Sequence, residues 1–280
     1  MALEVQSERP LVSVGIPTYN RPAGLRRTLQ HICRQTYPNL EILVSDNASP
    51  DPETEAVVRE FADIDARIRS FRQPSNIGAI ANFCFVLANA TGEYFMWAAD
   101  DDEWDERFIE TCMSYASPTC SVMTGFNTNY RARDYIEENP APLLSPNASL
   151  FQNVQNYFAL MQPSLFYGLH PRESLLFVLE LPNFDFNDCY VILRIILETN
   201  FQTVEPVLHR IGIDAPAYRI KYADQTLNRL RYWPFFWRSC LALVGCSRLS
   251  LAERVQLLGK LTWTVLDLRR HHELARTKAA

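Results

Sequence analysis

Short apolar runs alternate with helical patterns through the first hundred residues of this chain of 280 residues. Runs rich in β-branched and aromatic residues predict strands at 11–16, 41–45, 68–71 and 94–98. Apolar residues spaced three or four positions apart predict helices over about 25–33, 53–62, 80–87 and 105–115. This alternation predicts an α/β fold with a mostly parallel, Rossmann-like sheet flanked by helices.

The pattern is less regular after residue 118. It predicts a strand at 122–126, helices near 150–161, 172–180 and 188–198, and a late strand at 203–208. From about residue 222 it predicts two helices, broken near Pro234 and around 245–251. The second half is therefore expected to differ from the first and to end in a helical extension.

Composition narrows the class of protein. The net charge of -5 and the pI near 5.6 argue against a nucleic-acid partner, which normally requires a basic surface. The seven cysteines form no CxxC pair, a pattern typical of reduced core thiols. The polar N-terminus does not resemble a signal peptide, and no apolar run approaches the roughly 20 residues that span a bilayer. We therefore expect a cytoplasmic protein.

Three consecutive aspartates, Asp100, Asp101 and Asp102, follow the apolar run that begins at residue 94. Adjacent carboxylates repel one another, and a divalent cation offsets their charge. The alternative is a solvated acidic turn before the next helix. Ligands of parallel sheets bind beyond the carboxyl ends of the strands. We expect Thr18, Asp46 and Asp101 to share one such rim, which favours a metal-assisted site.

Four segments, in a fixed order along the chain, carry a resemblance to a known family. They are 12–21 (VSVGIPTYNR), 41–51, 76–79 (NIGA) with Asn82, and 92–104. Together they resemble the family 2 glycosyltransferases of GT-A fold (the nucleotide-diphospho-sugar transferase fold), of the kind that builds bacterial surface polysaccharides. The resemblance implies a nucleotide-sugar-binding half at 1–125, an acceptor-binding half at 126–221 and a C-terminal helical segment at 222–280.

The resemblance also implies a nucleotide pocket. Asp46 would accept the N3–H of uracil or thymine, so that a UDP- or dTDP-sugar is the expected donor; a turn contact with Asn47 is the alternative. Asn76 and Gly78 would approach the ribose or diphosphate at a helix N-terminus, and an ordinary helix cap explains them equally well. The other residues expected in this pocket are Pro17, Thr18, Tyr19 and Asn20.

The family's metal motif aligns on the aspartate run when Trp104 is matched to the aromatic residue that often follows it. Asp101 is then the principal ligand of Mg²⁺ or Mn²⁺, with Asp102 adjacent and Asp100 near the ribose or the metal's waters. Many relatives carry an aspartate at the position of Ala99. This departure leaves the register within the three aspartates open.

An inverting enzyme needs a base for the acceptor hydroxyl, and family relatives take it from a Glu-Asp pair at the start of a late helix. Asp188 is the best match, with Asn187 in place of the glutamate and Asp185 in reserve. The alternative is that Asp188 only caps that helix. His209 and Arg210 follow the late strand, where a basic group would stabilise the leaving diphosphate; a surface arginine is the simpler interpretation.

The implied acceptor is a glycan or polyprenyl-linked saccharide. Cations interleave with aromatic residues over 218–238, which suits peripheral contact with the inner face of a membrane. The alternative is a helix that packs its aromatics on the catalytic domain. Two rival functions stay open: a sugar-nucleotide nucleotidyltransferase, disfavoured because 17–22 contains no glycine, and a non-catalytic nucleotide-binding scaffold of a glycan-assembly complex.

Overall fold

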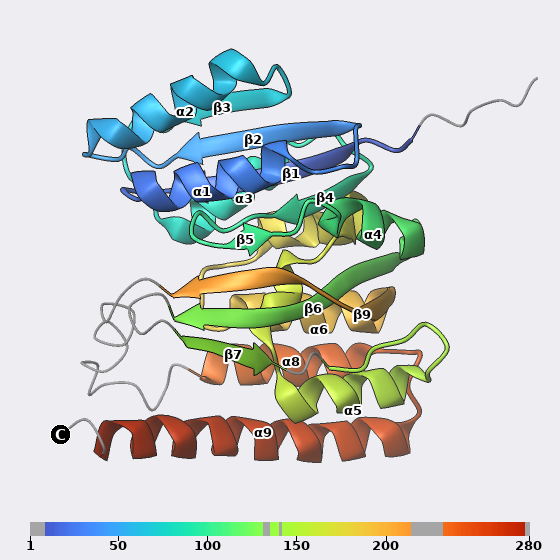
Figure 1. Cartoon of the computed structure of the whole chain (residues 1–280). Coiled ribbons are helices and arrows are strands. Elements are labelled where there is room, and N and C mark those ends of the chain that lie inside the picture. Colours follow the sequence, from blue (N-terminus) through green and yellow to red (C-terminus); the bar gives the residue numbers. More distant parts are fainter. Residues whose placement is uncertain (1–8, 131–134, 140–141, 214–231, 278–280) are drawn as a thin grey trace, which may run out of the picture.

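The computed structural model describes residues 9–130, 135–139, 142–213 and 232–277, arranged around two sheets (Figure 1). The first sheet has the strand order β3-β2-β1-β4-β8, in which β1 to β4 are parallel and β8 is antiparallel. Its strands are β1 (Val12–Thr18), β2 (Leu40–Asp46), β3 (Ile68–Arg72), β4 (Tyr94–Trp97) and β8 (His170–Pro171).

Helices cover both faces of this sheet. Figure 1 shows α1 (Pro22–Cys33) and α2 (Pro52–Ile64) in front of it and α3 (Ala79–Ala88) behind it. Residues of β1 and β2 are buried throughout, because side chains on both sides of each strand face helices. The continuous apolar runs that predicted these strands follow from this double burial.

The second sheet has the order β5-β9-β6-β7. Its long central strands β6 (Cys120–Tyr130) and β9 (Asn200–Ile213) are parallel, with register shifts around Gly125. The edges are β5 (Glu103–Trp104) and β7 (Tyr135–Asn139), both antiparallel to their neighbours. Helices α4 (Phe108–Tyr115) and α6 (Asn187–Glu198) contact this sheet. The arrowheads of β2, β6 and β9 lie at one side of the molecule (Figure 1).

Three further helices form the base of the molecule in Figure 1: α5 (Leu150–Leu160), α8 (Trp233–Gly245) and α9 (Leu251–Thr277). Helix α9 packs on α5 and α8, and α8 packs on α6. Two 3₁₀ segments, η2 (Pro163–Tyr167) and η3 (Arg172–Glu180), connect this part to the first sheet. No helix in the described ranges combines the length and the apolar character needed to cross a bilayer.

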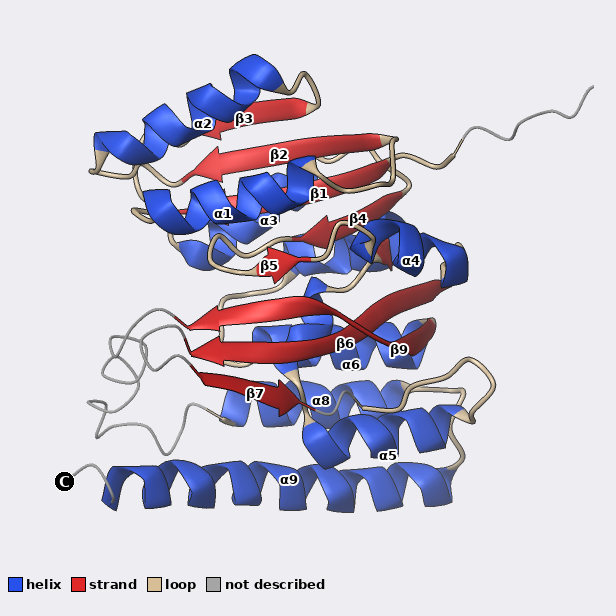
Figure 2. Cartoon of the chain, viewed as in Figure 1, coloured by secondary structure: helices blue, strands red, loops and turns tan. Residues whose placement is uncertain are grey.

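The structure confirms the predicted strands and most of the helices, as the colouring by secondary structure shows (Figure 2). The bounds of two predicted elements need correction. The helix expected from residue 105 begins at Phe108, because Asp105 accepts the backbone N–H of Arg107 in a preceding turn. Residues 172–180 are helical as predicted, in the 3₁₀ form. The late strand extends over 200–213, well beyond 203–208.

The division of the chain at residues 125 and 221 stays a prediction. Strand β6 runs across the first boundary. Residues 214–231, which contain the second, lie outside the described part of the chain.

Candidate functional site

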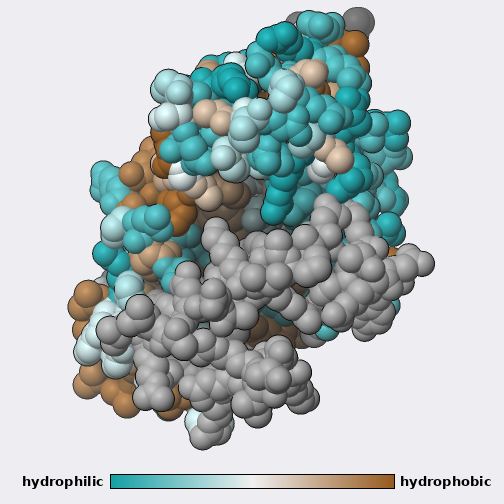
Figure 3. All heavy atoms as spheres, turned by 90° about the vertical axis from the view of Figure 1, so that its left-hand side faces the viewer, coloured by the Kyte–Doolittle hydropathy of each residue, from teal (hydrophilic) through white to brown (hydrophobic). Residues whose placement is uncertain are grey.

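The carboxyl ends of β1 and β2 form the rim on which the predicted site lies. The two strands pair in register, so that Thr18 stands opposite Asp46. The loops beyond them are joined, since the Asn47 N–H donates to the Thr18 carbonyl at 3.0 Å and the Asn20 N–H donates to Ser49 Oγ at 2.8 Å. Of the other predicted residues, Pro17 is buried in β1, whereas Tyr19 and Asn20 are exposed. Viewed onto this side, the upper half of the surface is mainly hydrophilic (Figure 3).

Asp46 is buried at the rim and has partners on both carboxylate oxygens. Its Oδ1 accepts hydrogen bonds from the Ser49 backbone N–H (2.9 Å) and from Ser49 Oγ. Its Oδ2 pairs with Arg72 at the end of β3, which also donates to the Ser49 carbonyl at 3.0 Å. The turn contact weighed for Asp46 is therefore present, made with Ser49 rather than Asn47. A carboxylate has lone pairs for a further donor, so these contacts leave base recognition chemically open.

Residues 98–102, between β4 and β5, are named here the aspartate loop. Helix α1 holds this loop against the first sheet. Thr28 Oγ1 donates to the carbonyls of Ala99 (3.0 Å) and Asp102 (3.1 Å). Gly24 lies so close that a Cβ there would stand 2.4 Å from the Asp100 carbonyl oxygen. The loop therefore requires a glycine at this position of the helix, and the side chain of Thr28 fixes its backbone.

The side chains of Asp100 and Asp101 face the end of β1. Thr18 Oγ1 donates to Asp100 Oδ2 at 2.8 Å. The guanidinium of Arg21 bridges the two carboxylates, with Nη1 at 3.3 Å from Asp100 Oδ1 and a close ion pair to Asp101 Oδ2. Burial raises the pKa of Asp100, and burial together with the charges of Asp102 and Asp100 raises the pKa of Asp101 to about 7. The structure thus brings Thr18, Asp46, Asp100 and Asp101 to one rim.

Asp102 turns toward the second sheet instead. Its Oδ2 lies 2.9 Å from His209 Nε2, and its Oδ1 accepts the Gly212 N–H at 2.9 Å, both from β9. His209 is fully buried and stacks on Trp104 with ring centroids 4.9 Å apart. These contacts join the two sheets. The suggested action of His209 on a leaving group finds no support here, because its imidazole is enclosed between Asp102 and Trp104.

Asn76 and Gly78 lie beside the β2 loop. Asn47 Nδ2 donates to Asn76 Oδ1 at 3.1 Å, and Asn47 Oδ1 accepts the Ile77 N–H at 2.8 Å. Gly78 is the N-cap of α3 with φ of 87°, and its own N–H donates to Asn76 Oδ1 at 2.9 Å. Asn76 therefore shapes the loop before the helix, and no side chain of the described residues caps α3 at Gly78.

Asp188 lies in the first turn of α6, half-buried. Helix α6 leads into β9, so its N-terminus lies at the side of the molecule where the strands of both sheets end (Figure 1). Asp188 Oδ1 accepts the Cys189 N–H at 2.7 Å, and burial raises the pKa of the carboxyl group. Asp188 is not the N-cap, which is Phe186, but a carboxylate in the first turn is stabilised by the helix dipole, as the alternative for this residue also held. The raised pKa is a property that a general base also needs.

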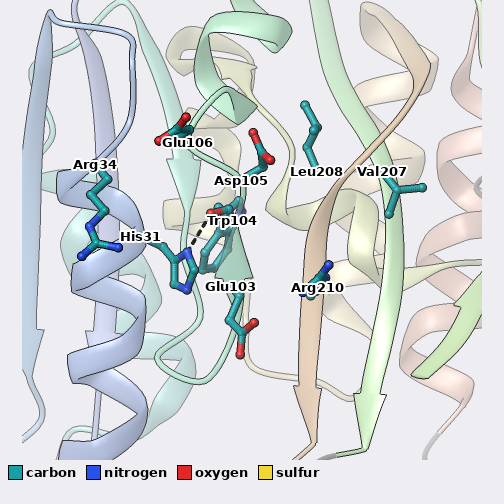
Figure 4. Close-up of a pocket in the computed structure, with 9 residues that line it drawn as sticks. All are labelled: His31, Arg34, Glu103, Trp104, Asp105, Glu106, Val207, Leu208 and Arg210. Carbon is teal, nitrogen blue, oxygen red and sulfur yellow. Dashed lines mark hydrogen bonds between the residues drawn. The ribbon is translucent and has the colours of Figure 1, made fainter. Parts of the chain in front are cut away.

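A cavity of about 300 Å³ lies beside the segment 103–106, and of the candidates proposed from the sequence Arg210 lines it (Figure 4). It is lined by α1, by the segment 103–106 and by β9. His31 Nδ1 donates to the Trp104 carbonyl across it at 2.9 Å, and Arg210 borders it. Arg210 therefore faces this cavity rather than the rim.

The rim residues fit a divalent cation that is completed by other oxygen ligands. No cluster of three or more His, Cys, Asp or Glu suited to a metal occurs among the described residues. Mg²⁺ and Mn²⁺ nevertheless bind through one or two carboxylates when diphosphate and water supply the other ligands. Asp100 and Asp101 form a pair of neighbouring carboxylates of this kind, and in this structure the guanidinium of Arg21 bridges them.

Comparison with solved structures identifies the fold. The chain superimposes on *Staphylococcus aureus* TarS 1-349 in complex with UDP-GlcNAc with a TM-score of 0.73, at 13% identity, over 90% of this chain and 71% of that one. A mannosyltransferase from *Pyrobaculum calidifontis*, in complex with GDP-Man and Mn²⁺, gives a TM-score of 0.57 at 20% identity, over 97% of this chain and 84% of that one. The fold is GT-A.

Sequence comparison identifies the family. The profile described as Glycosyl transferase family 2 matches residues 13–165, more than half of the chain. An uncharacterized glycosyltransferase of *Haemophilus influenzae* is 28% identical over 64% of this chain and 69% of its own length. A *Campylobacter jejuni* GalNAc(5)-diNAcBac-PP-undecaprenol beta-1,3-glucosyltransferase is 36% identical over 39% of this chain and 35% of its own. The chain belongs to glycosyl transferase family 2.

The other curated relatives are matched over a smaller share of their length. Apart from the *H. influenzae* protein, the aligned segment spans between 14% and 42% of each relative compared.

Proposed function

We propose that this protein transfers a sugar from a nucleoside-diphosphate sugar to a hydroxyl of a glycan or lipid-linked saccharide, with inversion at the anomeric carbon. The main support for this proposal is that Thr18, Asp46, Asp100 and Asp101 lie together at one rim of a GT-A fold. Family membership favours sugar transfer over nucleotidyl transfer.

The donor is a UDP- or dTDP-sugar. Asp46 accepts the N3–H of uracil or thymine, a donor that cytosine lacks, and Arg72 and Ser49 hold the carboxylate in place for it. The UDP-GlcNAc named in the TarS complex supports a uracil nucleotide. The N-terminus of α3 at Gly78 offers backbone N–H groups to the diphosphate. Pro17, Thr18, Tyr19 and Asn20 supply the strand end against which the nucleoside lies.

Asp101, with Asp100 beside it, holds Mg²⁺ or Mn²⁺; the Mn²⁺ named with the *P. calidifontis* mannosyltransferase supports this choice. A cation held there would offset the negative charge that develops on the diphosphate as it leaves. Thr18 orients Asp100, and Thr28 and Gly24 fix the backbone of the loop. Asp102 anchors β9, and its place among the metal ligands stays a prediction.

Asp188 takes the proton of the acceptor hydroxyl as that oxygen attacks the anomeric carbon. Burial raises the pKa of this carboxyl group toward the range in which a base works best, and the Cys189 N–H holds Oδ1 in a fixed direction. The undecaprenol-linked saccharide in the name of the *C. jejuni* relative supports a lipid-linked acceptor.

A panel of nucleotide sugars tests the donor first. We expect a UDP- or dTDP-sugar with Mn²⁺ to raise the melting temperature, and GDP- and CMP-sugars to leave it unchanged. Asp46→Asn should weaken the stabilisation, because the neutral amide oxygen is a weaker acceptor of N3–H and loses the ion pair with Arg72 that holds the carboxylate.

Transfer is then measured with the stabilising donor. Asp188→Asn should lower kcat by ~10² to 10⁴-fold while donor binding persists. Near wild-type transfer in Asp188→Asn would assign the base elsewhere, with Asp185→Asn as the matched comparison. Donor binding without transfer to any acceptor or to water, in the wild-type protein, would favour the non-catalytic scaffold.

A further inference from the structure

Helices α8 and α9 each present an apolar stripe to solvent. The eight residues of these stripes are named here the C-terminal apolar surface. Every one of them is exposed; on α8 Leu241 is 70% exposed, and on α9 Trp263 is 63% exposed. The surface consists of Trp233, Trp237, Leu241 and Val244 on α8 and of Leu251, Val255, Trp263 and Leu266 on α9.

These stripes are separate from the sides on which the two helices pack. On α8 Phe235 and Leu243 are buried, and on α9 Leu257 and Leu261 are fully buried. Thr264 Oγ1 also donates to the Phe158 carbonyl of α5 at 3.1 Å. The fold is therefore complete without the outer stripes. A helix that is apolar on two sides has a second partner, and aligned exposed side chains mark its location.

The exposed apolar residues recur at helical spacing along α8 and α9. On α8 they recur after four, four and three residues, and on α9 the first two are four residues apart and the last two three apart. Each stripe therefore follows one side of its helix. The rings of Trp233 and Trp237 stack with centroids 6.0 Å apart, which makes a continuous aromatic platform at the start of α8.

The charge of this part of the chain is opposite to that of the whole. Residues 232–266 contain four arginines or lysines and one acidic residue, Glu253, whereas the chain carries a net charge of -5. Three of these arginines contact neutral groups. Arg238 lies over the Phe184 ring, and Arg248 and Arg254 donate to backbone carbonyls. Their positive charge is therefore available to an anionic partner.

We propose that the C-terminal apolar surface docks on a membrane surface that contains anionic lipids. Apolar and tryptophan side chains enter the boundary between headgroups and acyl chains, and the neighbouring cations are attracted by the headgroup charge. The same cations disfavour a face-to-face pairing of two copies, which would bring like charges together. Of the aromatics predicted to contact a membrane over 218–238, Trp233 and Trp237 belong to this surface, Phe235 is buried, and residues 218–231 lie outside the described part.

This inference is independent of the proposed sugar transfer, and vesicle binding tests it directly. The full chain is sedimented with vesicles of phosphatidylcholine alone and with vesicles of phosphatidylcholine and phosphatidylglycerol in equal amounts. We expect binding to the anionic vesicles, with a blue shift of tryptophan fluorescence, and weaker binding when salt is added.

Two variants distinguish binding through the C-terminal apolar surface from nonspecific adsorption to vesicles. The double variant Trp237→Gln with Leu241→Gln should lower partitioning by about tenfold or more, because it removes apolar area from the boundary. Ile64→Gln is the matched control: Ile64 is 77% exposed on α2, far from this surface, and its substitution should leave partitioning unchanged. Both variants replace exposed side chains, and their melting temperatures verify that the fold is retained.

Three results would overturn the inference. One is an absence of wild-type binding to anionic vesicles, and another is equal binding by the double variant. The third is light scattering that shows a dimer which the double variant separates into monomers, since the surface would then join two copies of the chain.

Discussion

Arg21 and Asp101 form an ion pair at the rim of the first sheet, and the same guanidinium reaches Asp100 at 3.3 Å. Arg21 immediately precedes α1, and its side chain is about half exposed. It therefore places a positive charge where the proposed Mg²⁺ or Mn²⁺ would bind. A divalent cation and this guanidinium cannot both lie against Asp101 Oδ2, so they compete for it.

Arg21→Gln is accordingly expected to tighten Mn²⁺ binding in the absence of nucleotide. The ion pair is partly exposed, so its loss should be worth about 1 kcal/mol, or roughly fivefold in the dissociation constant. Calorimetric titration with Mn²⁺ measures it. Arg26→Gln is the control, because Arg26 lies on the same helix and pairs with Glu60. Weaker Mn²⁺ binding by Arg21→Gln would mean that Arg21 supports the metal site instead of competing for it.

Gly24→Ala should disturb the aspartate loop, because Gly24 packs directly against the backbone of this loop. The new Cβ would stand 2.4 Å from the Asp100 carbonyl oxygen, which is backbone and cannot rotate away. We expect unfolding in urea to show a loss of about 1–3 kcal/mol and the Mn²⁺-dependent stabilisation by a nucleoside diphosphate to weaken.

Gly259→Ala is the matched control for this prediction. Gly259 also lies in a helix, but a Cβ there meets no atom within 4 Å. Alanine should therefore stabilise the protein by about 0.5–1 kcal/mol through helix propensity alone. A similar gain in Gly24→Ala would contradict the close approach between α1 and the loop.

The sequence was sufficient to predict four of the five strands of the first sheet and the shared rim, because these follow from local rules; the short edge strand β8 was missed. Strand-forming runs are short and bounded by turn residues, and the ends of parallel strands meet at one edge. Thr18 and Asp46 could be placed together on this ground alone. The resemblance to the family then assigned Asp100 and Asp101 to the same site.

Contacts between distant segments could not be predicted in the same way. The pairs Arg21 with Asp101 and Asp102 with His209 join residues about 80 and 107 positions apart. Both pairs depend on how the two sheets and α1 pack against one another. Nothing in the local pattern distinguishes Asp102, which faces β9, from Asp101, which faces β1. Strand β7 was missed because its residues, YIEEN, are mainly polar on an exposed edge.

His170 provides a prediction about stability that does not depend on the proposed function. It is fully buried, with Nδ1 accepting from Ser121 Oγ at 3.0 Å and Nε2 donating to the Phe166 carbonyl at 3.2 Å. Burial disfavours the imidazolium and lowers the pKa of His170 from 6.5 to about 4. As the pH falls from 6.5 toward 4, the unfolded chain binds a proton that the folded protein does not bind. The free energy of unfolding therefore falls over this window and is unaffected by His170 above it.

The difference between wild type and His170→Gln isolates this effect, since all other groups titrate in both proteins. Urea unfolding should show the wild type losing roughly 2.5 kcal/mol relative to the variant between about pH 7.5 and about pH 4.5. Ser121→Ala is the control: it removes a hydrogen bond but leaves the imidazole buried, so its stability should be lower at every pH and keep the wild-type slope. Parallel curves for wild type and His170→Gln would show that the folded protein accepts the proton at His170 as readily as the unfolded chain does.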